Sequence, residues 1–421
     1  MKKTLIFVIL ILSVITLFAR EFESTAIKYL TYLYSKQFAK AVEMSTEIMK
    51  SQLPEKKLKQ TWETIENAYG KFQGLEKIDY TKNGDYEVYM FTSKFEKMKL
   101  AIIISVDKNG KIAGLFFNQV QKYDYKTPDY ADKSKFKELD ITIGKKWKLN
   151  GKLTIPNGKG PFPAIILIHG SGPNDMDESI GPNKIFKDLA YGLSSNGIVV
   201  LRYDKRTKVY GNKMKSITLK DEVFEDVIYA IDYLSKLDYV DKIYILGHSL
   251  GGYLAPYIAK EDNRISGVIL MAAPGSPLEE LTINQLEYLK KFASEEEVKT
   301  YDILIEKLKK VRNNELSDNE YVLGATVKYY KELRKYNPIN FLPDLKIPVL
   351  ILQGKRDYQV TKKDYDILKN YANNYESHLY KELNHLFISG KGDPNPYEYY
   401  NESHVDKKVM EDIVKWINKI N

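Results

Sequence analysis

The chain contains no cysteine among its 421 residues. This absence excludes disulfide bonds, thiolate metal sites and a cysteine nucleophile. It also excludes a lipoprotein whose lipid is attached to a cysteine that follows an export signal. Histidine is scarce too, with five residues in the chain, so few side chains can serve as a general base near neutral pH.

A concentrated basic tract is also missing. The 64 Lys and Arg outnumber the 56 Asp and Glu, for a net charge of +8, but the positive residues are spread along the chain, singly or in short pairs such as Lys2 and Lys3. Proteins that bind nucleic acids usually gather basic residues on one face or in one segment. The sequence therefore argues against a nucleic-acid partner. A hydrophobic content of 43% is typical of a globular protein, and the length favours two domains.

The N-terminal segment has the layout of a signal peptide. Two lysines precede an uncharged apolar run over 5–18, and Ala19 follows it. This order of charged, apolar and small residues predicts a signal peptide over 1–19, and thus an exported, periplasmic or extracellular protein. The run is rather short for a helix that crosses a bilayer. An uncleaved N-terminal membrane anchor stays open as the alternative, because Leu17 is not an ideal residue two positions before the cut.

Residues 20–120 are expected to form a small α+β domain. Apolar residues recur at helical spacing in its first half. Three strands are expected to follow, at 85–95, 99–107 and 111–120. The last two are joined by "DKNG", in which Gly110 permits the positive φ of a hairpin turn. We expect a curved antiparallel sheet here, and then a polar linker over 121–136.

From residue 137 to the C-terminus, continuous apolar runs alternate with helical stretches. This rhythm is typical of a mostly parallel sheet that helices cover on both faces. No strand is evident between Pro274 and Pro348, so we expect a helical cap inserted over about 275–345. Two of its helices are expected to begin with capping boxes, Ser294 with Glu297 and Ser317 with Glu320.

The motif that carries chemistry is Gly247-His248-Ser249-Leu250-Gly251, which matches G-x-S-x-G. An apolar strand precedes it and an amphipathic helix follows. A strand that turns sharply into a helix strains the residue at the apex, and the flanking glycines remove Cβ atoms that would clash there. A serine that merely caps the helix is the alternative, but a cap does not need a glycine on both sides. We therefore predict that Ser249 is a nucleophile.

A serine nucleophile needs a base and an orienting acid. In this architecture they follow in the order serine, acid, histidine, each after a later strand. "IPVLILQGKRD" places Asp357 after a strand and a glycine turn, and "HLYKELNH" places His385 after the last expected strand. We predict a triad of Ser249, Asp357 and His385. The remaining candidates are His169, His248, His378 and His404 for the base, and Asp364, Asp366 and Glu382 for the acid. Asp357 could instead pair with Lys355 or Arg356.

Acyl transfer also needs two donors for an oxyanion. The amide of Leu250, directly after the nucleophile, is the first candidate. The second is expected in the "HGSG" turn after an early strand, where Gly170 and Gly172 let the backbone approach a ligand. Ser171 is the preferred donor there, and Gly172 is the alternative. In the later "RYDKR" segment, Asp204 and Arg206 are expected to form a structural ion pair outside the site.

From about residue 139 to the end, the chain resembles bacterial serine esterases of the α/β-hydrolase superfamily. The resemblance rests on "HGSGPND" at the oxyanion turn, "GHSLGG" at the nucleophile and "QGKRDYQV" at the acid. It is similar to EstD-like carboxylesterases of thermophilic bacteria, which carry a small domain before the hydrolase domain. The resemblance implies an α/β-hydrolase fold and hydrolysis of small, short-chain acyl esters without cofactor or metal. It assigns the triad to Ser249, Asp357 and His385.

Two other functions stay open. An acyltransferase or a peptidase acting on cell-envelope material would use the same triad with a different acceptor or acyl group. A catalytically silent protein that binds an envelope ligand would keep the fold without the chemistry. A dienelactone hydrolase would need cysteine, and a dehalogenase or epoxide hydrolase aspartate, at position 249, where the chain has serine.

Overall fold

The computed structural model describes residues 22–83, 85–119, 125–211, 214, 218–293 and 295–421. The chain divides into two compact units, Met1–Tyr123 and Asp124–Asn421. The expected signal peptide over 1–19 and the expected helix cap at Ser294 lie outside the described residues. Among the helices that the structure describes, none combines the length and the apolar character needed to cross a membrane.

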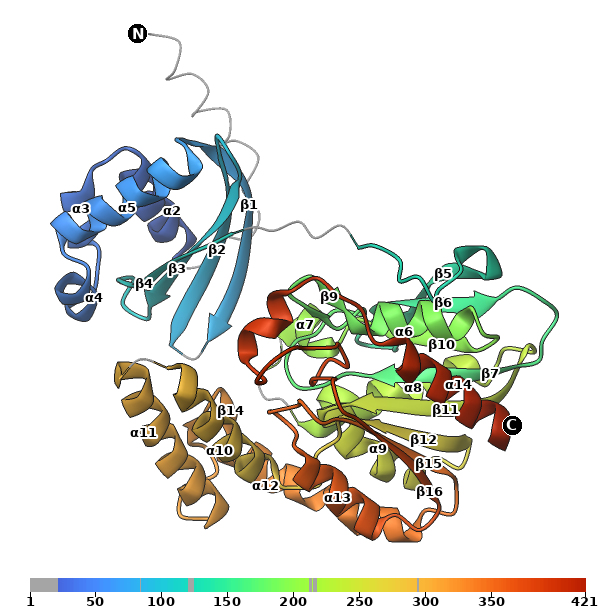
Figure 1. Ribbon diagram of the computed structural model, residues 1–421. Coiled ribbons are helices and arrows are strands. Elements are labelled where there is room, and N and C mark those ends of the chain that lie inside the picture. The colour runs from blue at the N-terminus through green and yellow to red at the C-terminus, as the bar shows by residue number, and fades with distance from the viewer. Residues whose placement is uncertain (1–21, 84, 120–124, 212–213, 215–217, 294) are drawn as a thin grey trace. The chain divides into compact units, whose positions relative to one another are not determined.

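The N-terminal unit packs four helices against one face of a four-stranded antiparallel sheet (Figure 1). The helices are α2 (Glu23–Tyr34), α3 (Phe38–Glu43), α4 (Glu47–Gln52) and α5 (Glu55–Tyr69). The strands follow in the spatial order of the sequence: β1 (Phe72–Asn83), β2 (Tyr86–Phe95), β3 (Lys99–Asp107) and β4 (Ile112–Gln119). Trp62 of α5 and alternate residues of the strands, such as Phe91 and Ile102, form the core between the layers.

Strand β1 is the one strand of this sheet that the sequence pattern did not predict. Its pairing with β2 shifts register between Phe72 and Gly74 and again between Leu75 and Lys77. Each shift interrupts the alternation of inward and outward side chains, which is the pattern that reveals a strand in sequence. The α+β class is as expected, with one more strand than the pattern predicts.

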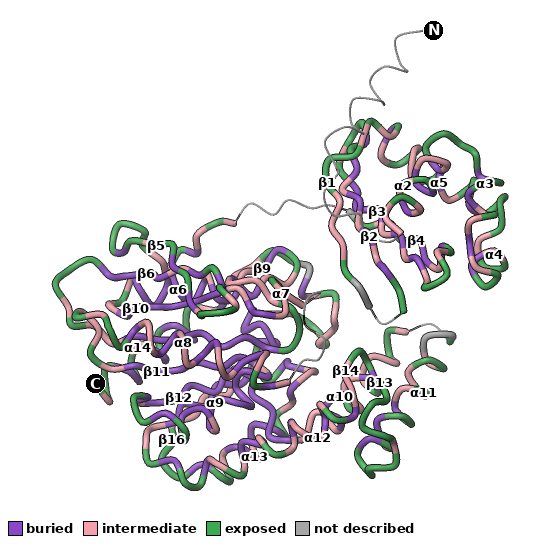
Figure 2. Tube along the Cα trace, turned by 180° about the vertical axis from the view of Figure 1, so that it is seen from behind, coloured by how far each residue is buried: buried purple, intermediate pink, exposed green. Residues whose placement is uncertain are grey.

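The second unit is built on an eight-stranded sheet in the order β16-β15-β12-β11-β7-β10-β6-β5. Its strands are β5 (Phe136–Ile143), β6 (Leu149–Pro156), β7 (Phe162–Ile168), β10 (Val199–Tyr203), β11 (Val240–His248), β12 (Ile265–Met271), β15 (Val349–Gly354) and β16 (Tyr375–Tyr380). Strand β6 pairs antiparallel with β5 and β10, and the remaining pairs are parallel. The central strands are buried along most of their length (Figure 2). This burial on both faces accounts for their continuous runs of Val, Ile and Leu.

Helices cover both faces of this sheet and enclose two separate cores. One core lies under α8 (Glu225–Leu234), α9 (Leu250–Glu261) and α13 (Lys362–Tyr371). The other lies under α6 (Ile185–Ser194) and α14 (Lys407–Ile420). Shorter elements in the connections are β8 (Ser179–Ile180), β9 (Asn183–Lys184), α7 (Arg206–Tyr210) and the helical turns 133–135, 220–224, 338–340, 342–344 and 396–400. The α/β class expected from the alternating rhythm is confirmed.

Between β12 and β15 the chain forms a helical cap. Its helices are α10 (Leu278–Leu289), a short turn (Lys290–Phe292), α11 (Glu295–Arg312) and α12 (Val327–Lys335). They share a small core of their own, which includes Leu308 and Val311. The expectation of helices alone is wrong in one place, because Tyr321–Val322 and Ala325–Thr326 form a two-stranded hairpin. Ser317 and Glu320 do bond to each other, but in a turn before this hairpin, and the helix begins at Val327 with Thr326 as its cap.

Candidate active site

Ser249 occupies the turn between strand β11 and helix α9. Its backbone has φ 52° and ψ −116°, outside the regions that residues with a side chain ordinarily adopt. The turn is closed so tightly that a Cβ on Gly247 would lie 2.3 Å from the Gly251 carbonyl, and one on Gly251 would lie 2.1 Å from the Ile168 oxygen. Because only glycine fits at these two positions, the sequence holds Ser249 in a strained conformation at the end of the sheet.

Asp357 lies in the turn after β15, and four donors fix its carboxylate. Oδ2 accepts hydrogen bonds from Nδ1 of His385 at 2.7 Å and from the Gln353 side chain at 3.1 Å. Oδ1 accepts from the amides of Gln359 at 2.8 Å and Val360 at 2.9 Å. A proton on Nδ1 of His385 leaves Nε2 as an acceptor, which is the tautomer that a general base requires.

The loop that carries His385 lies against the nucleophile turn. Nε2 of His248 donates to the carbonyl oxygen of His385 at 3.0 Å, and the two rings are 4.8 Å apart between centroids. Since His248 directly precedes Ser249, this contact brings His385 beside the residue predicted as the nucleophile. His385 was expected directly after the last strand. Strand β16 ends at Tyr380, so a loop of four residues separates the strand from His385.

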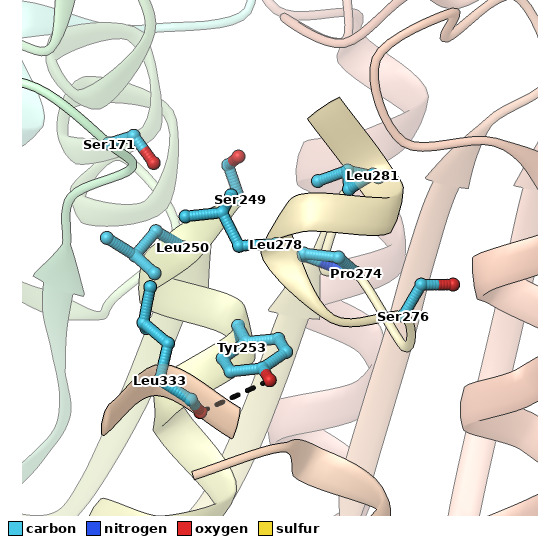
Figure 3. A pocket seen from close by; sticks show the side chains of 9 residues that line it. All are labelled: Ser171, Ser249, Leu250, Tyr253, Pro274, Ser276, Leu278, Leu281 and Leu333. Atoms are coloured by element: carbon cyan, nitrogen blue, oxygen red, sulfur yellow. Dashed lines mark hydrogen bonds between the residues drawn. The ribbon is translucent and has the colours of Figure 1, made fainter. Parts of the chain in front are cut away.

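The two predicted oxyanion donors belong to segments that meet at Ser249. Ser171 and Leu250 line the same pocket as Ser249, and Figure 3 shows the three side chains together. The backbone at Gly170 approaches so closely that a Cβ there would lie 3.2 Å from the Ser249 Cβ. Within the described residues, neither the Ser171 nor the Leu250 amide has a hydrogen-bond acceptor. Both are therefore available to a ligand atom.

The pocket next to Ser249 is small and mostly apolar. Its cavity volume is about 20 Å³. The lining comes from the loop after β7, from the turn at Ser249 and helix α9, from the loop after β12, and from cap helices α10 and α12 (Figure 3): Ser171, Ser249, Leu250, Tyr253, Pro274, Ser276, Leu278, Leu281 and Leu333. Its one aromatic side chain, Tyr253, directs its hydroxyl to the Leu333 carbonyl at 3.3 Å. The wall therefore presents mainly hydrocarbon to a bound group.

A buried ion pair beside the site was missed by sequence reasoning. Nδ1 of His248 lies 3.2 Å from the Glu178 carboxylate, and both side chains are almost fully buried. Burial lowers the pKa of His248, but the charge of Glu178 and the His385 carbonyl outweigh it, so the pKa lies above its usual value. Burial raises the pKa of Glu178, but His248 and the Gly170 amide outweigh it, so this pKa lies below its usual value. Glu178 follows "NDMD" in an acidic loop, and nothing in that pattern marks it as buried.

The expectation that Asp204 and Arg206 form an ion pair is wrong. Arg206 instead bonds to Asp226 on helix α8, with Nη2 2.5 Å from Oδ1, while Asp204 accepts the Met176 amide at 2.9 Å. Asp226 lies 20 positions further along the chain, in a helix that packs against β5, β7 and β11. Asp204 thus supports the loop after β7, whereas Arg206 binds helix α8, and the charges of the segment alone do not reveal either contact.

The other candidate residues have structural partners. Arg356 pairs with Glu398, and Asp364 accepts the amides of Gly275 and Ser276 at 3.2 and 3.0 Å. The remaining histidines lie elsewhere: His169 contacts the Asp175 carbonyl, His378 pairs with Glu376, and His404 pairs with Asp188. Burial lowers the pKa of His169 to about 4, which suits a neutral side chain within the core.

Comparisons of the sequence with known proteins match both units. Residues 163–391, which include the predicted triad, match the family described as "Serine aminopeptidase, S33". Residues 26–115 match the family described as "Protein of unknown function (DUF3887)". The protein called Esterase EstD, from Thermotoga maritima, is 43% identical over 401 residues, which span 94% of this chain and 96% of that protein.

Solved structures with a similar fold include two esterases. Est1E from Butyrivibrio proteoclasticus is 19% identical and has a TM-score of 0.47, over 67% of this chain and 98% of that one. An esterase from Pyrococcus furiosus is 16% identical and has a TM-score of 0.43, over 68% of this chain and 90% of that one.

Proposed function

Since the chain belongs to the α/β-hydrolase superfamily and, within it, to the family of Esterase EstD, we propose that it is a serine carboxylesterase whose triad is Ser249, His385 and Asp357. One observation carries the proposal. The hydrogen bond of 2.7 Å between Asp357 and His385 lies against the strained turn that presents Ser249. Each group follows a different strand: Ser249 comes directly after β11, Asp357 lies in the turn after β15, and His385 lies in the loop after β16.

The mechanism follows from these positions. Nε2 of His385 removes the proton of Ser249 as the hydroxyl oxygen attacks the ester carbonyl. Asp357 keeps the imidazole in the required tautomer and stabilises the imidazolium that forms. The amides of Leu250 and Ser171 donate to the oxyanion. His385 then protonates the departing alcohol, and water repeats the sequence on the acyl-enzyme.

The pocket supports a preference for short acyl chains. Its volume of about 20 Å³ is close to that needed by one water molecule, so it accommodates little more than a small acyl group. Leu278, Leu281 and Leu333 line it, and their hydrocarbon walls favour an apolar chain over a charged one.

A series of p-nitrophenyl esters from acetate to octanoate tests this proposal. We expect kcat/KM to be highest for the shortest chains and to fall as the chain lengthens. The Ser249→Ala variant is the matched control, and we expect it to lose about 10⁶-fold in kcat. Ester hydrolysis that survives in folded Ser249→Ala protein would exclude Ser249 as the nucleophile.

Peptidase activity is the second candidate, because the matched family is described as "Serine aminopeptidase, S33". Aminoacyl p-nitroanilides, assayed beside the esters, distinguish the two activities. Transfer of the acyl group to an added amine or alcohol would reveal an acyltransferase. A fluorophosphonate probe that fails to label folded wild-type protein would instead favour a silent ligand-binding protein.

We also propose that the protein is exported by the segment over 1–19. The support is the order of its residues, with two lysines, an apolar run and Ala19. Sequencing the N-terminus of protein recovered from the periplasm or medium tests this, with Arg20 expected as the first residue. Full-length protein retained in the membrane fraction would favour the uncleaved anchor.

A further inference from the structure

Lys205 is a buried cation that the proposed mechanism does not use. It follows strand β10, and only 2% of its surface is exposed. Its Nζ donates to the carbonyl oxygen of Gly170 at 2.8 Å and lies 2.6 Å from Oε1 of Glu222. Burying a lysine costs several kcal/mol before pairing offsets it, roughly as for any ion removed from water. A buried lysine directed at one backbone carbonyl therefore calls for an explanation.

The carbonyl that Lys205 holds belongs to the same peptide group as the Ser171 amide. A trans peptide is planar, and its C=O and N–H bonds point in opposite directions. Fixing the Gly170 oxygen therefore fixes the direction of the Ser171 N–H. The Asn174 side chain donates to the same oxygen at 3.2 Å. The Gly170 amide is held as well, by the Glu178 carboxylate at 2.6 Å.

We propose that Lys205 is a positioning residue of the oxyanion hole, which aims the Ser171 N–H at the oxygen that becomes negative during acyl transfer. This inference rests on the esterase function proposed above and concerns the same site. The positive charge on the carbonyl side also polarises the peptide, which makes its N–H a stronger donor. Lys205 contacts neither the substrate nor the reacting atoms in this assignment.

The ion partner of Lys205 connects this arrangement to the cap. Oε2 of Glu222 accepts the hydroxyl of Tyr329, on helix α12, at 2.7 Å. The same helix contributes Leu333 to the pocket wall. A hydrogen bond from Tyr329 to Glu222, the ion pair between Glu222 and Lys205, and a hydrogen bond from Lys205 to the Gly170 carbonyl thus connect α12 to the Gly170–Ser171 peptide. Helix α12, which contributes to the acyl pocket, therefore also binds the ion partner of Lys205.

The test neutralises the buried pair while keeping its shape. Lys205→Met alone leaves Glu222 as an unpaired buried charge and can fail to fold, so the conclusion rests on the double variant Lys205→Met/Glu222→Gln. With p-nitrophenyl acetate we expect kcat to fall by about 10- to 100-fold, somewhat less than for loss of an oxyanion donor, with KM little changed. A trifluoromethyl ketone, which forms a tetrahedral oxyanion on the serine, is expected to lose affinity by the same factor as kcat/KM.

The matched control neutralises the neighbouring buried pair in the variant Arg206→Met/Asp226→Asn. We expect it to lower the melting temperature but to leave kcat and the inhibitor affinity at wild-type values. Folded Lys205→Met/Glu222→Gln protein with wild-type kcat and inhibitor affinity would overturn the inference, as would equal losses in the control. Wild-type hydrolysis that persists in Ser249→Ala would instead overturn the proposed function, and this inference with it.

Discussion

Leu281→Ala should shift the enzyme towards longer acyl chains. Leu281 lines the pocket from cap helix α10, and its exposed fraction is 4%. The substitution removes three carbon atoms from the wall, which makes room for about three more acyl carbons, from acetyl to valeryl. Each buried methylene contributes about 0.8 kcal/mol, so three contribute about 2.4 kcal/mol, or roughly 60-fold. We expect the ratio of kcat/KM for p-nitrophenyl valerate over acetate to rise by up to that factor.

Leu286→Ala is the matched control for this prediction. Leu286 lies on the same helix, has a similar exposed fraction of 7%, and belongs to the core of the cap. Both variants remove the same atoms, and truncating a buried leucine costs about 2–5 kcal/mol of stability. A valerate-to-acetate ratio that rises equally in both variants would show that loosening of the cap, rather than pocket volume, sets the preference. An unchanged ratio in Leu281→Ala would refute the assignment of this pocket to the acyl group.

Three further outcomes are expected. Asp357→Asn should lower kcat by about 10⁴-fold through loss of the productive tautomer, and a fall of less than tenfold in ester hydrolysis would contradict its role. Glu178→Gln should remove stability that the wild type has between the lowered pKa of Glu178 and the raised pKa of His248. Urea unfolding across pH should therefore show the largest difference between wild type and variant in that window, shrinking as acid protonates Glu178 and as alkali deprotonates His248. Gly251→Ala would place a Cβ 2.1 Å from the Ile168 oxygen, so we expect little folded protein, and a folded, fully active variant would contradict the close packing of this turn.

Local patterns were enough to select candidate residues for the parts of the site that depend on chain order. The glycines around Ser249 mark the turn because only residues without Cβ fit there. Asp357 and His385 could be placed because each follows a strand, and the C-terminal ends of parallel strands meet at one edge of a sheet. The structure brings the acid and the base into contact at that edge.

Contacts between distant segments could not be predicted in the same way. Glu178 and Lys205 stand in charged stretches that look like ordinary surface loops, and their burial depends on His248 and Glu222. Arg206 pairs with Asp226 rather than with its neighbour Asp204, because the fold brings helix α8 beside Arg206. Charge patterns show which residues can form ion pairs, but only the packing of elements decides which pairs form.

The cap has a hydrophobic core of its own, so substitutions in the cap need not disturb the packing of the sheet. The residues of that core, such as Leu308 and Val311, pack among themselves rather than within the two cores of the sheet. Leu278 packs against the cap core and against the α9 side of the sheet, and it also lines the pocket. Substitutions inside the cap can therefore reshape the pocket through this leucine while the strands that precede Ser249, Asp357 and His385 stay unaltered. Related enzymes can therefore change their substrate preference while they keep the residues that carry out the reaction.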